Sequence, residues 1–404
     1  MTFDDFELDH RAVKILHDKR ITEPTPIQAA AIPFALEGRD VIGLAQTGTG
    51  KTLAYALPAL TRLVQGRVAR NMMLVLVPTR ELCVQVHEVI EQLGAAMKIR
   101  STLIYGGVGY DRQTSDLEEG VPIVVATPGR LLDHMSRGRV NFGALQILVL
   151  DEADRMLDMG FLPDIQRIVR RLPVDRQTLM FSATFPREIE RLAESMMHNA
   201  ERVSVGTVAK PVDTVTQEVY AVRQEDKTRL LTILLEDKKV DSALVFLRTR
   251  ERTERLAASL KKKHFKIAQI HGNRSQSQRQ QALDGFRAGK YNLLVATDVA
   301  ARGLDIDGVS HVFNYDIPPT ADDYIHRIGR TARAKAEGAA ITFAAPSEHK
   351  ALETIERALG HNIERVEWED APSLLSLYKP EAATPAARAA RRRSGPGRRM
   401  LRRR

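Results

Sequence analysis

The sequence predicts an α/β protein with two consecutive domains, each built on a mostly parallel β-sheet flanked by helices. Its 404 residues exceed the usual size of one domain, about 100 to 200 residues. Short apolar runs rich in β-branched residues alternate with longer mixed segments, as in repeated strand–helix–strand units. This rhythm restarts after residues 204–216, which favours two domains of the same class.

The apolar runs give the expected strands in chain order. In the first domain they are VIGLA from residue 41, MMLVLV from 72, STLIY from 101, PIVVAT from 122, LQILVL from 145 and TLMFSA from 178. In the second they are SALVF from 242, KIAQI from 266, NLLVAT from 292, VSHVFNY from 309 and AAITFA from 339. We therefore expect domains at residues 1–205 and 217–372, joined by a linker at 206–216.

Positive charge is concentrated at the C-terminal end. The net charge is +9, and residues 382–404 contain nine Arg and no Asp or Glu, leaving 51 of the 60 basic residues against 51 acidic ones. Residues 373–404 are rich in Ala, Pro, Gly and Arg, so we expect a disordered basic tail. Such a tail can bind phosphate backbones by counterion release, and a merely solubilising role is the alternative.

The composition excludes several other classes of protein. With 43% hydrophobic and 27% charged residues, most of the chain should fold. The single cysteine, Cys83, and the lack of zinc-ligand spacing argue against disulfides and structural metal. The acidic N-terminus has no apolar leader, and no apolar run approaches the roughly 18 residues of a membrane span. We therefore expect a cytoplasmic protein without membrane partners.

A glycine loop follows the first expected strand. The segment AQTGTGKT, residues 45–52, lies between VIGLA and the expected helix LAYALPALTRL, although Ala45 stands where the generic motif has Gly. In such a loop backbone N–H groups surround phosphates, Lys51 can reach the β and γ phosphates, and Thr52 can bind Mg²⁺. The sequence thus predicts a nucleoside triphosphate site. Its expected residues are Ala45, Gln46, Thr47, Gly48, Thr49, Gly50, Lys51 and Thr52.

Two adjacent acids follow the strand LQILVL. Asp151 is expected to hold Mg²⁺ through water, and Glu152 to orient and deprotonate the water that attacks the γ phosphate. Lys51, Asp151 and Glu152 are therefore the expected catalytic residues of the first domain. Other adjacent acids, such as Asp4 and Asp5, follow no buried strand.

The letters D-E-A-D at residues 151–154, about 100 residues after the phosphate loop, resemble the motif of the DEAD-box RNA helicases. The resemblance spans roughly residues 1–375, and IHGNRSQ at 270–276 is most similar to the bacterial RhlE type. It implies two tandem RecA-like domains and an RNA-dependent ATPase that uses ATP and Mg²⁺. PTPIQ at 24–28 resembles the family's Q motif, which implies that Gln28 reads the adenine edge and Phe3 stacks on the ring.

Further segments resemble the family's motifs that bind RNA and those that couple ATP hydrolysis to strand separation. They are PTREL at 78–82, Gly106–Gly107, TPGR at 127–130, VFLRTR at 245–250, HG at 271–272, QSQR at 276–279 and VATDVAARGLDI at 295–306. The RNA-binding residues that the resemblance implies are Thr79, Arg80, Gly106, Gly107, Thr127, Arg130, Thr249, Gly272, Arg279 and Thr297. Those it implies for coupling hydrolysis to strand separation are Ser182, Thr184, His326 and Arg327.

The segment DYIHRIGRTARA at 323–334 supplies a row of arginines. Arg327, Arg330 and Arg333 are three residues apart, on one face if the segment is helical, and such a row suits a polyphosphate. The resemblance implies that Arg330 and Arg333 are arginine fingers directed at the γ phosphate, and that Asp305 contacts the ribose.

Placing the two halves of an ATP site on two domains would make domain closure depend on ATP, so ATP and RNA should bind cooperatively. The resemblance implies local unwinding of RNA through contacts that tolerate any sequence, with ribosome-assembly or RNA-decay proteins as the suggested partner classes. Two alternatives remain open at this point. One is a DNA helicase, and the other is an ATP-gated RNA clamp that hydrolyses ATP only to release RNA.

Overall fold

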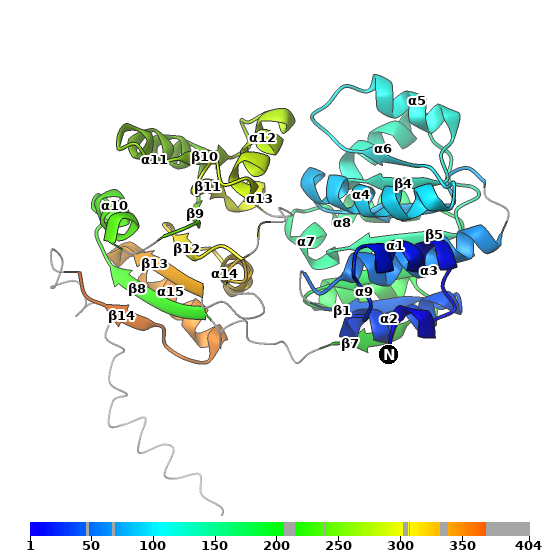
Figure 1. Cartoon of the computed structure of the whole chain (residues 1–404), viewed down its shortest axis with the longest axis horizontal. Coiled ribbons are helices and arrows are strands. Elements are labelled where there is room, and N and C mark those ends of the chain that lie inside the picture. Colours follow the sequence, from blue (N-terminus) through cyan, green and yellow to red (C-terminus); the bar gives the residue numbers. More distant parts are fainter. Residues whose placement is uncertain are drawn as a thin grey trace, which may run out of the picture. The chain divides into compact units, whose positions relative to one another are not determined.

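The computed structural model describes residues 1–45, 48–66, 69–205, 215–237, 240–301, 306, 308–331 and 338–368. Within this part the chain forms two α/β units, each defined by a parallel sheet of seven described strands with its flanking helices (Figure 1). The predicted fold class of tandem α/β domains is confirmed. The expected tail at 373–404 and most of the expected linker lie outside the described residues.

The first unit begins with a short 3-10 helix and ends with an edge strand. Its elements are η1 (Phe3–Asp5), α1 (His10–Asp18), α2 (Pro26–Leu36), β1 (Val41–Leu44), α3 (Lys51–Gln65), β2 (Met73–Leu76), α4 (Arg80–Ala96), β3 (Ser101–Ile104), α5 (Asp111–Glu119), β4 (Ile123–Ala126), α6 (Pro128–Ser136), β5 (Ile147–Asp151), α7 (Ala153–Asp158), α8 (Leu162–Val169), β6 (Gln177–Ser182), α9 (Arg187–Met196) and β7 (Glu201–Ser204).

The second unit repeats the alternation of strands and helices. Its elements are β8 (Val215–Ala221), α10 (Lys227–Asp237), β9 (Ala243–Leu247), α11 (Arg250–Lys262), β10 (Ile267–Ile270), α12 (Gln276–Arg287), β11 (Leu293–Thr297), α13 (Asp298–Ala301), β12 (His311–Asn314), α14 (Ala321–Ile328), β13 (Gly338–Ala344), η3 (Pro346–Glu348), α15 (His349–Leu359) and β14 (Glu364–Val366). None of the described helices of either unit is both long and apolar enough to span a membrane.

The two sheets have the same kind of strand order. The first runs β3-β4-β2-β5-β6-β1-β7 and the second β10-β11-β9-β12-β13-β8-β14. All described pairings are parallel, so within each sheet the carboxyl ends of the strands meet at one edge. Loops at this edge are where open α/β sheets bind their ligands.

Each face of the first sheet is covered by its own apolar core. Val75 of β2 packs with residues of α1, α2, α3 and α4, whereas its neighbour Leu74 packs on the other face with residues of α6, α7, α8 and α9. This division follows from the alternation of side chains along a strand. Because both faces are buried, the strands read as continuous apolar runs, and this is why the sequence revealed them.

The expected strands agree with the structure except for three strands. Strands β1 to β6 and β9 to β13 coincide with the predicted apolar runs, but β7, β8 and β14 were not predicted. The edge strand β7 has the polar sequence ERVS and only Val203 is buried, so it offers no apolar run. Strand β8 begins at Val215, inside the expected linker, while the expected domain boundaries stay a prediction.

Candidate functional site

The predicted first-domain motifs gather at the carboxyl edge of the first sheet. The phosphate loop follows β1, the PTREL segment follows β2, the Gly106–Gly107 turn follows β3, and TPGR follows β4. The D-E-A-D segment begins at the last residue of β5, and Ser182 ends β6. Since these strands are parallel neighbours, segments far apart in the sequence become adjacent here.

Glycines shape the described part of the phosphate loop. Gly48 and Gly50 have φ values of 84° and 88°, in the left-handed region that favours glycine. Gly50 is the N-cap of α3, and a Cβ there would lie 2.4 Å from Nε2 of Gln28. Ala45 is buried and donates its N–H to the carbonyl of Ser182. Gln46 and Thr47 lie outside the described residues.

Lys51 and Asp151 form the charged centre of this site. Both side chains are buried, and neither Lys51 Nζ nor Asp151 Oδ1 has a hydrogen-bond partner in the described part of the chain. Burial raises the pKa of Asp151 to about 6, while the nearby Lys51 charge acts in the opposite direction. A buried ammonium and a buried carboxylate oxygen without partners suit a bound ligand. ATP phosphates would supply the partner of Lys51, and Mg²⁺ with its water would supply that of Asp151. The residues therefore fit both groups.

Tyr55 is a residue of this site that the sequence analysis missed. Its hydroxyl donates to Asp151 Oδ2 at 2.9 Å, and its ring is fully buried against Phe181. Burial raises the pKa of Tyr55 well above its ordinary value, so the phenol stays a neutral donor. The sequence could have suggested Tyr55 only through its position on the expected helix. It lies four residues after Lys51, about one helical turn, so both side chains lie on the same face.

Glu152 adopts a backbone conformation that is uncommon for its residue type. Its φ and ψ are 54° and 53°, in the left-handed region, directly after β5. Its Oε2 accepts a hydrogen bond from Nη1 of Arg155 at 2.5 Å, and both side chains are buried. The contact constrains the Glu152 carboxylate. Arg155 was not predicted; it lies in the first turn of α7, and Glu152 is the N-cap of that helix.

Asp154 connects the D-E-A-D segment to the end of β6. Its Oδ2 accepts hydrogen bonds from the backbone N–H of Ala183 at 3.1 Å, from that of Thr184 at 2.7 Å, and from Thr184 Oγ1 at 2.9 Å. Its own N–H donates to Ser182 Oγ at 3.1 Å. A displacement of β5 or α7 would therefore reach the Ser182–Thr184 segment directly.

The two residues expected at the adenine are engaged within the protein. Gln28 Oε1 accepts from the N–H of Thr25 at 2.8 Å, and its Nε2 donates to the carbonyl of Gly50 at 2.9 Å. Phe3 is fully buried and packs near Phe6, with ring centroids 6.4 Å apart. Gln28 thus joins the Q motif to the phosphate loop, and the adenine contacts stay a prediction.

The predicted RNA residues of the first unit lie on consecutive loops. The guanidinium of Arg80 lies so close to the glycine turn that a Cβ at Gly107 would be 2.1 Å from its Nη1. Gly107 has a φ of 84°, so the backbone conformation favours glycine there, whereas the Arg80 guanidinium is the end of a flexible side chain. Arg130 Nη2 donates to the carbonyl of Val108 at 3.1 Å. Thr79 and Thr127 are the N-caps of α4 and α6.

The predicted RNA residues of the second unit lie at the corresponding edge of the second sheet. Thr249 is the N-cap of α11 after β9, Gly272 follows β10, and Thr297 ends β11. Arg279 lies on α12 and donates from Nη2 to the carbonyl of Ala300 at 3.0 Å. The second sheet thus brings these residues to one edge, although their contact with RNA stays a prediction.

The expected row of arginines is not helical throughout. Helix α14 ends at Ile328, so Arg330 follows the helix, and Arg333 lies outside the described residues together with Asp305. Arg327 is buried, and its Nε and Nη2 each donate to the carboxylate of Asp298 at 2.6 Å. Because the helix ends before Arg330, the condition for a single helical face is not met between Arg327 and Arg330, and the role of the arginines at a phosphate stays a prediction.

Arg327 makes two further hydrogen bonds. Nη1 of Arg327 donates to Asn314 Oδ1 at 3.1 Å and to the carbonyl of Asp316 at 2.7 Å. These groups hold the guanidinium of Arg327 in buried contacts within the second unit. His326, one residue earlier, is only partly buried, and Arg330 is buried.

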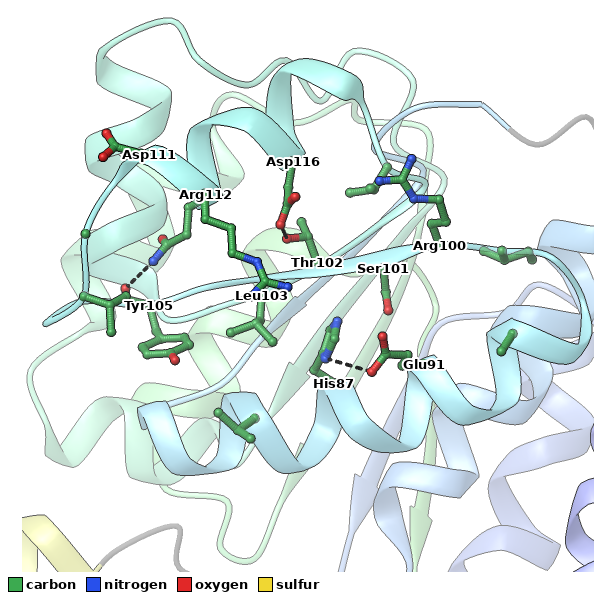
Figure 2. A pocket seen from close by; sticks show the side chains of 17 residues that line it. His87, Glu91, Arg100, Ser101, Thr102, Leu103, Tyr105, Asp111, Arg112 and Asp116 are labelled. Atoms are coloured by element: carbon green, nitrogen blue, oxygen red, sulfur yellow. Dashed lines mark hydrogen bonds and ion pairs between the residues drawn. The ribbon is translucent and has the colours of Figure 1, made fainter. Parts of the chain in front are cut away.

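A cavity of about 880 Å³ lies along the edge strand of the first sheet. Its walls come from α4 and α5 and its floor from β3 (Figure 2). Acidic and basic side chains both line it, and Thr102 Oγ1 donates to Asp116 Oδ2 at 2.7 Å within it. None of the predicted nucleotide-binding residues lines this cavity, but at Tyr105 and Val108 it reaches the predicted RNA turn.

Comparison with known proteins assigns both units to helicase families. Residues 25–192 match the DEAD/DEAH box helicase family, and residues 226–335 match the helicase conserved C-terminal domain. The fold and these matches define a helicase with two RecA-like domains. The chain belongs to the DEAD-box ATP-dependent RNA helicases.

The "DEAD-box ATP-dependent RNA helicase CshA" of Geobacillus kaustophilus is 43% identical over 90% of this chain and 78% of its own. The "ATP-dependent RNA helicase RhlB" of Cronobacter sakazakii is 42% identical over 98% of this chain and 94% of its own. Among solved structures, S. cerevisiae Dbp5 bound to RNA and ADP BeF3 has a TM-score of 0.81 at 33% identity, covering 94% of this chain and all of that one. Since these bacterial relatives are named CshA and RhlB, the RhlE subgroup stays a prediction.

Proposed function

We propose that this chain hydrolyses ATP in its first unit and uses the reaction to separate short RNA duplexes locally or to remodel RNA–protein complexes. The family assignment supplies the general activity. We further assign ATP hydrolysis, coupling and RNA binding to individual residues. The observation that carries it is the buried pair Lys51 and Asp151, because each has a polar atom that lacks a partner among the described residues and that ATP with its metal ion would satisfy.

The hydrolytic step is assigned to Glu152. Its carboxylate accepts a proton from a water molecule as the water oxygen attacks the γ phosphorus, and ADP leaves with the former bridging oxygen. Lys51 stabilises the charge on the transferred phosphoryl group. Thr52 and Asp151, the latter through water, would hold Mg²⁺, which neutralises phosphate charge. Arg155 supports this role because it constrains the Glu152 carboxylate at 2.5 Å.

Coupling to RNA is assigned to the contacts of Asp154. In this proposal, a change at the γ phosphate moves the D-E-A-D segment. The three hydrogen bonds that Asp154 accepts then transmit this movement to residues 183 and 184. We assign RNA contact in the first unit to Thr79, Arg80, Gly106, Gly107, Thr127 and Arg130. Their position on loops at one sheet edge supports binding of a single RNA strand along this edge. The contacts would go to the RNA backbone rather than to the bases.

The second unit completes the cycle in this proposal. Arg330 and Arg333 act as arginine fingers at the γ phosphate, Asp305 contacts the ribose, and His326 couples to the first unit. Thr249, Gly272, Arg279 and Thr297 provide the remaining RNA contacts. ATP and RNA then favour the same closed state, so each raises the affinity for the other.

Glu152→Gln tests the central assignment. The amide cannot accept the proton, so turnover should fall by about 100-fold or more while ATP-dependent RNA binding is retained. ATPase rates and RNA binding by fluorescence anisotropy are measured on the same preparations. Glu188→Gln, on the exposed side of α9, is the matched control and should leave both quantities unchanged. Hydrolysis near the unmodified rate in Glu152→Gln would remove Glu152 from its role.

A further inference from the structure

Tyr110 lies at the end of the loop that carries the predicted RNA turn. The loop runs from Tyr105, after β3, to Asp111, the first residue of α5, and Figure 2 shows these two side chains at its ends. Tyr110 was not among the residues that the family resemblance implied. Its surroundings nevertheless connect it to one of those residues, Arg130 of the TPGR segment.

Two guanidinium groups lie over the ring of Tyr110. The Cζ atom of Arg130 is 4.0 Å from the ring centroid, and that of Arg137 is 4.7 Å away. A cation this close to an aromatic face is attracted by the ring quadrupole, and arginine favours such stacking. The ring therefore restricts where the Arg130 guanidinium can lie.

The hydroxyl of Tyr110 fixes the ring in turn. It donates to Asp133 Oδ2, and Asp133 Oδ1 accepts from Arg137 Nε at 2.9 Å. Both contacts favour the ionised carboxylate, so the pKa of Asp133 lies below its usual range. His134 packs beside the ring with centroids 5.4 Å apart. The aromatic side chain is thus anchored to α6, the helix that carries Arg130.

Arg130 also contacts the loop itself. Its Nη2 donates to the carbonyl of Val108 at 3.1 Å, one residue after Gly107. The loop and the first turn of α6 are consequently joined twice, once through the Val108 carbonyl and once through the Tyr110 ring. Removal of the ring would leave only the first of these contacts.

We propose that Tyr110 is a positioning residue for RNA binding, which holds Arg130 and the Gly106–Gly107 turn in the geometry that receives the phosphate backbone. This inference rests on the proposed function, since Arg130 is assigned to RNA there. Tyr110 is not among the residues assigned to ATP or to the attacking water, so its effect should appear in RNA affinity.

A double-mutant cycle tests this role. Tyr110→Leu removes the ring, Arg130→Gln removes the cation, and the dissociation constant for single-stranded RNA is measured with a non-hydrolysable ATP analogue. Tyr110→Leu should weaken binding about fivefold, as expected when one cation–π interaction is removed. In the double variant, binding should match Arg130→Gln alone, because Tyr110 acts through Arg130. Additive losses, or no loss in Tyr110→Leu, would overturn the proposal.

Two further variants separate positioning from general damage. Tyr110→Phe keeps the ring and removes only the hydroxyl that donates to Asp133, so it should retain most of the RNA affinity. This variant keeps the proposal open to refutation if Tyr110→Leu fails to fold. A Tyr110→Phe loss as large as that of Arg130→Gln would contradict a role for the ring. Phe34→Leu removes another ring under an arginine, Arg39, at 5.1 Å in the same unit, and should leave RNA binding unchanged.

RNA binding by the unmodified protein separates failure of the proposed function from failure of the Tyr110 role. If it shows no ATP-dependent RNA binding, the proposed function fails and Tyr110 loses its role with it. If it binds RNA and the Tyr110 variants bind equally well, only the positioning role fails. The salt dependence gives a second readout. If Arg130 no longer reaches its phosphate in Tyr110→Leu, the slope of log affinity against log salt should become shallower by about one.

Discussion

Thr184→Val should uncouple ATP hydrolysis from strand separation. The substitution keeps the shape of the side chain and removes one hydrogen bond, from Thr184 Oγ1 to Asp154 Oδ2 at 2.9 Å. Two backbone donors remain on the same oxygen, from Ala183 and Thr184. A hydrogen bond to a charged group contributes about 1.5 to 3 kcal/mol, and Thr184 is only partly buried, so the lower end applies.

About 1.5 kcal/mol corresponds to roughly a tenfold change in an equilibrium. If the Asp154 contacts transmit the hydrolysis step, the number of RNA duplexes separated per ATP should therefore fall about tenfold. ATP hydrolysis itself should change much less, because Lys51, Asp151 and Glu152 are untouched.

The assay measures strand release from a labelled RNA duplex and phosphate release in the same reaction. Thr354→Val is the matched control, since its hydroxyl also makes one hydrogen bond, to the Lys350 carbonyl at 2.9 Å, on the exposed side of α15. This control should leave the ratio unchanged. An unchanged ratio in Thr184→Val, with both proteins folded to the same extent, would refute the reasoning.

Two other substitutions follow from buried contacts. Tyr55→Phe removes the donor to Asp151 at 2.9 Å, so the KM for ATP should rise about tenfold in steady-state kinetics, whereas an unchanged KM would show that the hydroxyl has no part in the site. Arg327→Met leaves Asp298 without its partner, which should lower the free energy of unfolding by about 3 to 5 kcal/mol in urea titrations. A loss below about 1 kcal/mol would mean that the pair is dispensable.

The sequence predicted the parts of the molecule that depend on local pattern. Buried parallel strands such as β5 appear as unbroken apolar runs, and a glycine loop between a strand and a helix reveals a phosphate site. The proximity of Lys51 and Asp151 could be expected because both lie near the carboxyl ends of strands of one parallel sheet. The strands β7 and β14 were missed because their short sequences, ERVS and ERV, contain no apolar run.

What the sequence did not reveal depends on side-chain packing between distant elements. Tyr55 and Tyr110 acquire their roles only because their side chains lie beside Asp151 and Arg130, 96 residues and 20 residues away in the chain. Arg327 illustrates the reverse case. Its spacing suggested a phosphate-binding row, but Asp298 holds it inside the second unit.

Release of RNA strands under multiple turnover tests the central claim most directly. A short labelled RNA duplex is placed in excess over the protein with ATP and Mg²⁺, and the released strand is followed in time. An RNA helicase should release several equivalents of strand per protein with ATP, and few with a non-hydrolysable analogue. Long-lived RNA binding with at most one equivalent of released strand would contradict strand separation as the function and favour an ATP-gated clamp.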